Sequence, residues 1–293
     1  MTVPKILVSG ATGRTGRHAI EYLKSAGIGV RALVHHEGPK ADALRALGTD
    51  VVIGDLLKLD DVAGALDGIE SAYFCYPIAP RLIDATSFFA VAAKEAGVKA
   101  IVNMSQISAR RHATSNAAQE HWVSERILDW TGIATTHLRP TFFAEWLTVM
   151  VNPEDIKTRN AIRLPMGEGR HAPIASEDQG RLIAAILQNP LPHAGKTYTL
   201  HGPIEMSHHE IAAAIGRALG RELHYEPITF EEFATSRLQQ IGSNPHVVQH
   251  LSEVTQDYQN KIFEGADGVI GAITGQPPMS VETFIEKNRS YFA

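Results

Sequence analysis

Three glycines, Gly10, Gly13 and Gly16, interrupt the stretch ILVSGATGRTGRHAI near the start of the chain. An apolar run precedes them and a helical pattern follows, which is the setting in which a glycine loop binds a pyrophosphate. Gly10 would permit a tight turn, Gly13 would let backbone N–H groups approach an anion, and Gly16 would let helix and strand pack closely. The positive end of the helix would then face the anion. We predict a dinucleotide site here, with a purely structural turn as the alternative.

The composition excludes several other kinds of site. The 293 residues are 44% hydrophobic, and the net charge of -5 argues against general binding to nucleic acid or anionic membranes. Cys75 is the single cysteine, which excludes internal disulfides and Cys-rich metal sites. The HHE triplet at 208–210 is interpreted as a helix start with Ser207 and Glu210 as its capping box, and we expect no metal. With no signal-like N-terminus and no apolar run of about 18 residues, we expect a cytoplasmic protein.

The elements that would position the glycine loop alternate between strand and helix. Strand-like runs fall at 5–10, 29–34, 50–55, 71–77, 99–105, 134–140 and 196–202. Helical patterns fall between and after them at 15–27, 40–48, 59–68, 81–97, 119–132 and 176–190. Strands separated by helices of this length are joined by right-handed crossovers and form a parallel sheet. The sequence therefore predicts an α/β fold, a Rossmann-like doubly wound parallel sheet.

The alternation stops after Pro140. Segments 142–157 and 163–175 are interpreted as irregular, and the chain from about 203 as mainly helical with little β character. We therefore expect a nucleotide-binding domain at 1–150 that also receives the helix and strand of 172–202. The segments 151–171 and 203–293 would form a smaller lid over the carboxyl ends of the strands.

The chain resembles the NmrA-like group of atypical short-chain dehydrogenase/reductases along nearly its whole length. The resemblance rests on GATGRTG, VRALV, VIGDL, GIATTHLRPTFF, GKTYTLHGP and ITGQPPMSVETFIEKN. That group includes NAD(P)H:quinone reductases, triphenylmethane reductase and redox-sensing regulators. The resemblance implies a nicotinamide dinucleotide as cofactor.

The residues after the second strand bear on which dinucleotide binds. NAD sites usually carry an acidic residue at this point, whereas this chain has His35 and His36. Together with Lys40 and Arg14 they could bind a 2′-phosphate, or they form a solvated surface cluster. We expect NADP(H) to be preferred and NAD(H) to be the alternative. The expected cofactor-binding residues, some of them by resemblance, are Gly10, Thr12, Gly13, Arg14, Thr15, Gly16, His35, His36, Lys40, Asp55, Leu56, Tyr76 and Pro77.

The tyrosine–lysine pair typical of short-chain dehydrogenases is missing, since none of the seven tyrosines has a lysine four residues later. By resemblance, His121 occupies the position of a catalytic lysine and could relay a proton near neutral pH, paired with Glu125 one helical turn later. The alternative is a ribose contact or packing. Ser105 resembles a catalytic Ser/Thr that hydrogen-bonds a substrate carbonyl, or it caps a turn. Residues expected to line the substrate pocket, or else to pack a lid, are Phe142, Phe143 and Trp146.

Two functions of different kinds fit these features. One is an NAD(P)H-dependent reductase of a quinone, dye or related conjugated carbonyl, for which the missing pair matters less than for alcohol oxidation. The other is a sensor that binds NAD(P) without turnover and reports to a protein partner. Nucleoside-sugar epimerisation is disfavoured by the missing pair. We expect a small-molecule substrate, no direct contact with nucleic acid or membrane, and a monomer or homodimer.

Overall fold

Seven parallel strands form the central sheet of the computed structural model, which describes residues 5–293. The strand order is β3–β2–β1–β4–β5–β6–β9, so the direction of winding reverses between β1 and β4. The strands are β1 (Ile6–Val8), β2 (Val30–Val34), β3 (Asp50–Ile53), β4 (Ser71–Phe74), β5 (Ala100–Met104), β6 (Ala134–Pro140) and β9 (Thr197–Leu200). The predicted doubly wound α/β fold is confirmed.

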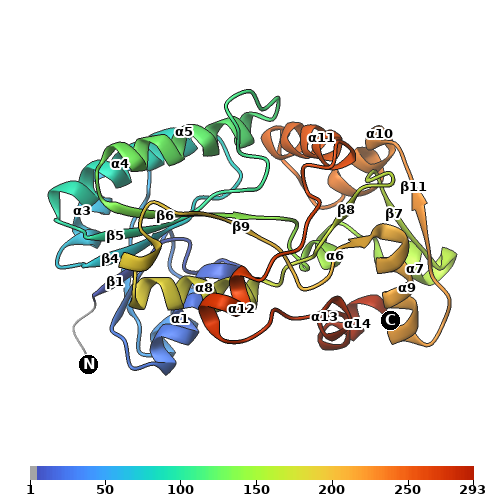
Figure 1. The fold of residues 1–293 in the computed structure, drawn as a ribbon, viewed down its shortest axis with the longest axis horizontal. Helices are drawn as coiled ribbons and strands as arrows, with labels where there is room; N and C mark the ends of the chain where they lie inside the picture. The colour runs from blue at the N-terminus through green and yellow to red at the C-terminus, as the bar shows by residue number, and fades with distance from the viewer. Residues whose placement is uncertain (1–4) are drawn as a thin grey trace.

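Helices cover both faces of this sheet (Figure 1). One face packs against α1 (Arg14–Ser25), α2 (Pro39–Ala46), α8 (Ser176–Gln188) and α12 (Val269–Thr274). The other packs against α3 (Leu59–Leu66), α4 (Leu82–Glu95) and α5 (Asn116–Trp130). Every residue of β1, β4 and β5 is buried, as is expected of parallel strands covered on both sides. The seven strand-like runs of the sequence are therefore the seven strands of one sheet.

The rest of the chain forms a smaller body with its own apolar core beside the sheet (Figure 1). Its helices are α6 (Trp146–Val149), α7 (Pro153–Arg159), α9 (His208–Leu219), α10 (Phe230–Phe233), the π-helix η2 (Ala234–Leu238), α11 (Pro245–Gln259), α13 (Val281–Lys287) and α14 (Arg289–Phe292). Its strands are β7 (Ala161–Leu164), β8 (Arg170–His171), β10 (Met206–Ser207) and β11 (His224–Pro227). A short 3-10 turn, η1 (Leu191–His193), precedes β9. The region is mainly helical, as expected.

One expectation for this smaller body is wrong. The segment 142–157 is not irregular, because it contains α6 and most of α7. α7 starts where the Asn152 side chain accepts a hydrogen bond from the Glu154 N–H and Pro153 takes the first helical position. The region also holds two strand pairs, β7 with β11 and β8 with β10. Elements this short carry too few residues for a helical or alternating pattern to be detected.

Local capping signals set two helix starts. α9 begins with the predicted capping box, in which Ser207 and Glu210 satisfy each other's backbone N–H groups. α5 begins at Asn116, three residues before the predicted start, because the Ser115 side chain accepts from the Ala118 N–H. No helix in residues 5–293 is long and apolar enough to cross a membrane. Over the same residues, His, Cys, Asp and Glu side chains form no cluster that could hold a metal ion.

Candidate cofactor and substrate site

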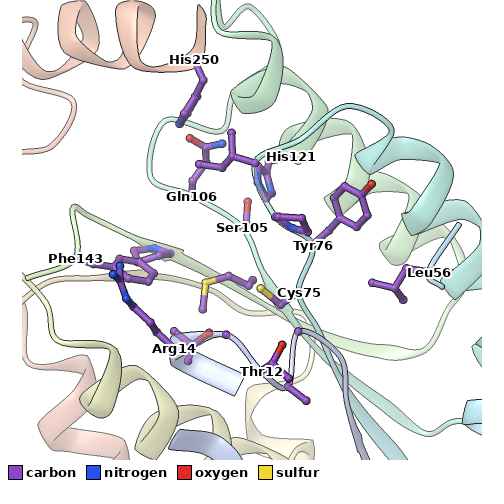
Figure 2. A pocket seen from close by; sticks show the side chains of 18 of the residues that line it. Thr12, Arg14, Leu56, Cys75, Tyr76, Ser105, Gln106, His121, Phe143 and His250 are labelled. Atoms are coloured by element: carbon purple, nitrogen blue, oxygen red, sulfur yellow. The ribbon is translucent and has the colours of Figure 1, made fainter. Parts of the chain in front are cut away.

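A cavity of about 800 Å³ lies at the carboxyl ends of β1, β2, β4, β5 and β6. It spans the point between β1 and β4 where the winding reverses, which is where doubly wound sheets bind their ligands. Leu56 lies toward one side of it and Phe143 toward the other, with the glycine loop below (Figure 2). The cavity therefore has a side formed by the β2 and β3 loops and a side formed by the β6 loop and the smaller body.

The glycine loop is shaped by close backbone approaches that only glycine permits. Gly10 has a φ of 59°, in the left-handed region. A Cβ on Gly16 would lie 2.4 Å from the Gly10 carbonyl oxygen, and one on Gly13 would lie 3.0 Å from that atom. Gly13 is the N-cap of α1 and has no side chain to cover the first-turn N–H groups, which face the cavity. The loop thus fits the anionic pyrophosphate of a dinucleotide.

The side chains of the loop divide into two kinds. Thr12 and Arg14 line the cavity, and Arg14 points toward Phe143, away from Leu56 (Figure 2). Thr15 also lines it, but its hydroxyl is bonded to the buried Tyr73 hydroxyl at 2.9 Å. Arg14 therefore points away from the side of the cavity on which Leu56 lies.

At the side of the cavity formed by the β2 and β3 loops, His35 and Asp55 come together, while His36 and Lys40 do not join them. His35 Nε2 lies 3.6 Å from Asp55 Oδ2, and both residues line the cavity together with Leu56. Asp55 Oδ1 also accepts a hydrogen bond from the Leu57 N–H at 2.9 Å, which fixes the loop. His36 packs against His35 with its ring tilted by 34° and lies outside the lining, and Lys40 is an exposed residue of α2.

The loop after β4 forms the wall facing the glycine loop. Cys75, Tyr76 and Pro77 all line the cavity. The Tyr76 hydroxyl donates to the Pro80 carbonyl at 3.1 Å, and burial together with the nearby Asp55 carboxylate raises the pKa of Tyr76. Cys75 was absent from the expected set, and its Cβ lies against Gly10, where an added Cβ would approach to 3.2 Å.

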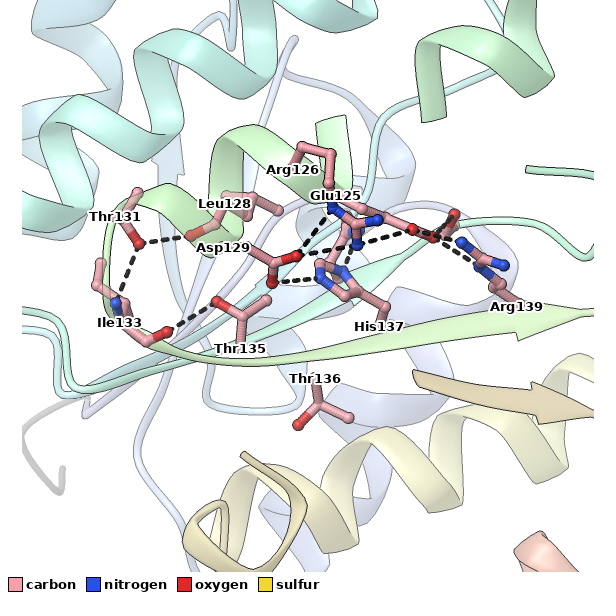
Figure 3. A network of polar contacts seen from close by, with 12 residues as sticks. Glu125, Arg126, Leu128, Asp129, Thr131, Ile133, Thr135, Thr136, His137 and Arg139 are labelled. Carbon is pink, nitrogen blue, oxygen red and sulfur yellow. Dashed lines mark hydrogen bonds and ion pairs between the residues drawn. The ribbon is translucent and has the colours of Figure 1, made fainter. Parts of the chain in front are cut away.

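Ser105 and Glu125 are joined, but only Ser105 lines the cavity. The Ser105 hydroxyl donates to Glu125 Oε1 at 2.7 Å, and Arg139 holds the same carboxylate with two hydrogen bonds of 2.8 and 2.6 Å (Figure 3). Glu125 is fully buried. Burial raises its pKa, but the bonds from Arg139 and Ser105 outweigh this, so the pKa of Glu125 is lowered. Glu125 is therefore an ionised partner of Arg139 behind the cavity wall.

The network continues behind Glu125 through His137, which β6 presents to α5 (Figure 3). His137 Nε2 lies 3.0 Å from Asp129 Oδ1, and its Nδ1 lies 3.0 Å from the Asn103 amide nitrogen. A carboxylate only accepts, so Nε2 carries the hydrogen and Nδ1 accepts from Asn103. These bonds fix α5 to β5 and β6, and with them the position of Ser105.

The expected pairing of His121 with Glu125 is not found. Both residues are described by the structure, and no hydrogen bond joins the His121 ring to Glu125. His121 lines the cavity and is 5% exposed, and burial lowers its pKa to about 4 despite the opposing effect of the Glu125 charge. The imidazole is therefore neutral near neutral pH, and proton relay by His121 stays a prediction.

The side of the cavity next to the smaller body is aromatic. Phe142, Phe143 and Trp146 line it, and Phe142 stacks on Phe263 at 4.6 Å between ring centroids. His250 and Val254 of α11 complete the wall with Gln106 of the β5 loop. No sequence pattern pointed to His250, Val254 and Phe263, which lie far along the chain, whereas Gln106 directly follows Ser105.

Comparisons with known proteins agree with this geometry. The model of the NmrA-like family matches residues 2–284. An NAD(P)H azoreductase of Xenophilus azovorans is 26% identical over 98% of this chain and 99% of its own length. An NADPH-dependent quinone oxidoreductase of Escherichia coli, solved with NADPH, superposes with a TM-score of 0.85 at 23% identity, over 97% of this chain and 99% of that one. Nmra, a negative transcriptional regulator solved with NAD, has a TM-score of 0.79 at 17% identity, over 97% and 95% of the two chains.

Proposed function

This chain belongs to the NmrA-like family, and we propose that it is an NAD(P)H-dependent reductase that transfers hydride to a quinone, a dye or a related conjugated carbonyl compound. One observation carries the proposal: the cavity that begins at a glycine loop fitted for a pyrophosphate ends in a chamber of aromatic side chains. A planar acceptor can lie against Phe142, Phe143 and Trp146 while the adenosine half of the cofactor extends from the glycine loop toward Leu56. The relationship to an azoreductase along nearly the full length supports the same class of acceptor.

The bound dinucleotide would supply the hydride, which is the difficult part of the chemistry. The protein's part is to bind and orient. The first-turn N–H groups of α1 and the Arg14 guanidinium would bind the pyrophosphate of the cofactor. Tyr76 and Pro77 would cover the part of the cofactor between the pyrophosphate and the nicotinamide. His121 is neutral, so it would act as a hydrogen-bonding wall of the site rather than as a stored acid. Water would then supply the proton that completes reduction.

We propose a preference for NADP(H) over NAD(H). His35 is the cavity residue that directly follows β2, and its side chain is 62% exposed, so a phosphate could reach it beside Asp55. Glu37, the first acid after β2, is turned away and bound to Arg45 by two hydrogen bonds. The nearby Asp55 carboxylate is engaged by the Leu57 N–H. Replacing His35 with Asp should lower the ratio of kcat/KM for NADPH to that for NADH.

The decisive experiment follows consumption of NADPH and of NADH with a panel of quinones, azo dyes and triphenylmethane dyes. Calorimetric titrations of both cofactors accompany it. Turnover of any acceptor supports the reductase, and the relative rates give the cofactor preference. Tight cofactor binding with no turnover on the whole panel would favour the sensor, which needs the glycine loop but no acceptor. Failure to bind either cofactor would refute both functions.

A further inference from the structure

On the basis of the reductase proposed above, we propose that Gln106, and not Ser105, donates the hydrogen bond that holds the oxygen or nitrogen atom of the acceptor. Gln106 lines the cavity, and Figure 2 shows its amide among the side chains of Ser105, His121 and His250. This group forms the polar part of a chamber whose other walls are aromatic. It is therefore the place where a conjugated acceptor would set its polar atom.

Ser105 cannot donate to a ligand while the network behind it is intact. A hydroxyl carries one hydrogen, and that of Ser105 goes to Glu125 Oε1 at 2.7 Å. The carboxylate is fully buried and held ionised by Arg139, so it is a stronger acceptor than a neutral carbonyl. Ser105 therefore offers only lone pairs to the cavity, which suits a ligand hydroxyl but not a carbonyl oxygen.

Gln106 differs from Ser105 because its side-chain oxygen is already bonded, whereas its N–H donor is left for a ligand. Its Oε1 accepts a hydrogen bond from the Ser108 hydroxyl at 2.7 Å. Its Nε2 is buried and has no hydrogen-bond partner among residues 5–293. A buried amide hydrogen without an acceptor is destabilising, and a ligand atom that accepts it removes that cost. The last torsion of a glutamine side chain is soft, so a small rotation turns Nε2 toward a ligand.

The neighbouring rings carry no positive charge near neutral pH. Burial lowers the pKa of His250 to about 3 and that of His121 to about 4, so both are neutral near neutral pH. The Nδ1 of His250 is bonded to the Ser115 hydroxyl at 2.7 Å, which fixes the ring. The amide of Gln106 thus stands between two neutral, buried imidazoles as an N–H donor with no partner of its own (Figure 2).

The chemical consequence concerns the charge that forms on the acceptor. Addition of a hydride, with its two electrons, to a quinone or other conjugated carbonyl leaves negative charge on the oxygen. A prepositioned N–H donor stabilises that charge as it develops, and water then supplies the proton. Gln106 itself neither gains nor loses a proton in this scheme.

The test replaces Gln106 with Glu, which has nearly the same shape but cannot donate when ionised. We expect kcat/KM for the quinone to fall by about 100-fold near neutral pH. The loss should shrink as the pH falls through the pKa of the new carboxyl group, because the protonated acid donates again. The Kd for NADPH should not change. Gln119→Glu is the matched control, since Gln119 is exposed on α5 and its Nε2 is bonded to the Arg111 carbonyl.

Several outcomes would overturn the inference. A loss of activity that is equal at every pH would mean that Gln106 is structural, and a weaker Kd for NADPH would make it a cofactor ligand. Calorimetric binding of the quinone to the NADP⁺-loaded protein separates this inference from the proposed function. Quinone binding that is at least about tenfold weaker in Gln106→Glu than in the wild type supports the inference. This holds even if the wild type has no turnover, and then only the proposed reaction is refuted. Equal affinity, or no binding to the wild type, refutes it.

Discussion

Arg139 neutralises the most deeply buried carboxylate beside the site, so replacing it with Met should strongly destabilise the protein. Glu125 is fully buried, and Arg139 supplies two of its hydrogen bonds, at 2.8 and 2.6 Å. Met keeps much of the side-chain volume but leaves the carboxylate without its countercharge. Removing one partner of a buried ion pair costs about 3–5 kcal/mol, because the remaining charge stays out of water.

The pH dependence of this loss distinguishes a charge effect from a packing effect. In the wild type the pKa of Glu125 is lowered, so its contribution to stability is present above the unfolded pKa of about 4.3 and is lost as the pH falls below it. Without Arg139, burial raises the folded pKa above the unfolded one, so the folded protein loses stability as the pH rises. The difference between variant and wild type should therefore be largest near neutral pH and shrink toward about pH 4.

Urea unfolding of the two proteins at a series of pH values measures this difference. Arg126→Met is the matched control, since Arg126 lies 3.5 Å from the same carboxylate but is partly exposed, and its loss should cost less than about 1 kcal/mol. The double variant Glu125→Gln with Arg139→Met should recover much of the lost stability. If Arg139→Met costs no more than Arg126→Met near neutral pH, the assignment of Glu125 as an ionised partner is wrong.

Three further predictions concern the cavity and the buried histidines. Gly13→Val should abolish cofactor binding in calorimetry without unfolding the protein, and unchanged affinity would contradict the pyrophosphate assignment. His121→Ala should lower kcat more than it weakens cofactor binding, whereas a loss of binding alone would make His121 a ribose contact. Burial lowers the pKa of His121 to about 4 and those of His208 and His250 to about 3, so the unfolded chain binds more protons below about pH 6.5. The free energy of unfolding should therefore fall by about 2 kcal/mol per histidine on acidification to about pH 5, and a flat urea-unfolding profile over that interval would contradict it.

The fold could be predicted because its signals are local. Each strand of the sheet is a short run of strand-forming residues between helical segments, and the right-handed crossover leaves few ways to connect such units. The glycine loop is equally local, since Gly10, Gly13 and Gly16 form one turn between β1 and α1. The short elements of the smaller body escaped prediction because two to four residues show no period, and their pairing depends on segments far apart in the chain.

The polar contacts of the site could not be predicted from local signals. The spacing of four residues correctly placed His121 and Glu125 on one face of a helix. Spacing could not predict which neighbouring side chain would bind the Glu125 carboxylate. Arg139 of β6 offers two parallel N–H groups and a permanent charge, and therefore outcompetes an imidazole for the same carboxylate. Because Arg139 holds the Glu125 carboxylate beside Ser105, the Ser105 hydroxyl donates to that carboxylate and not into the cavity. The sequence by itself thus determined the sheet and the glycine loop, whereas only the tertiary structure, by bringing β6 and α11 against α5, decided which polar atoms face the cavity.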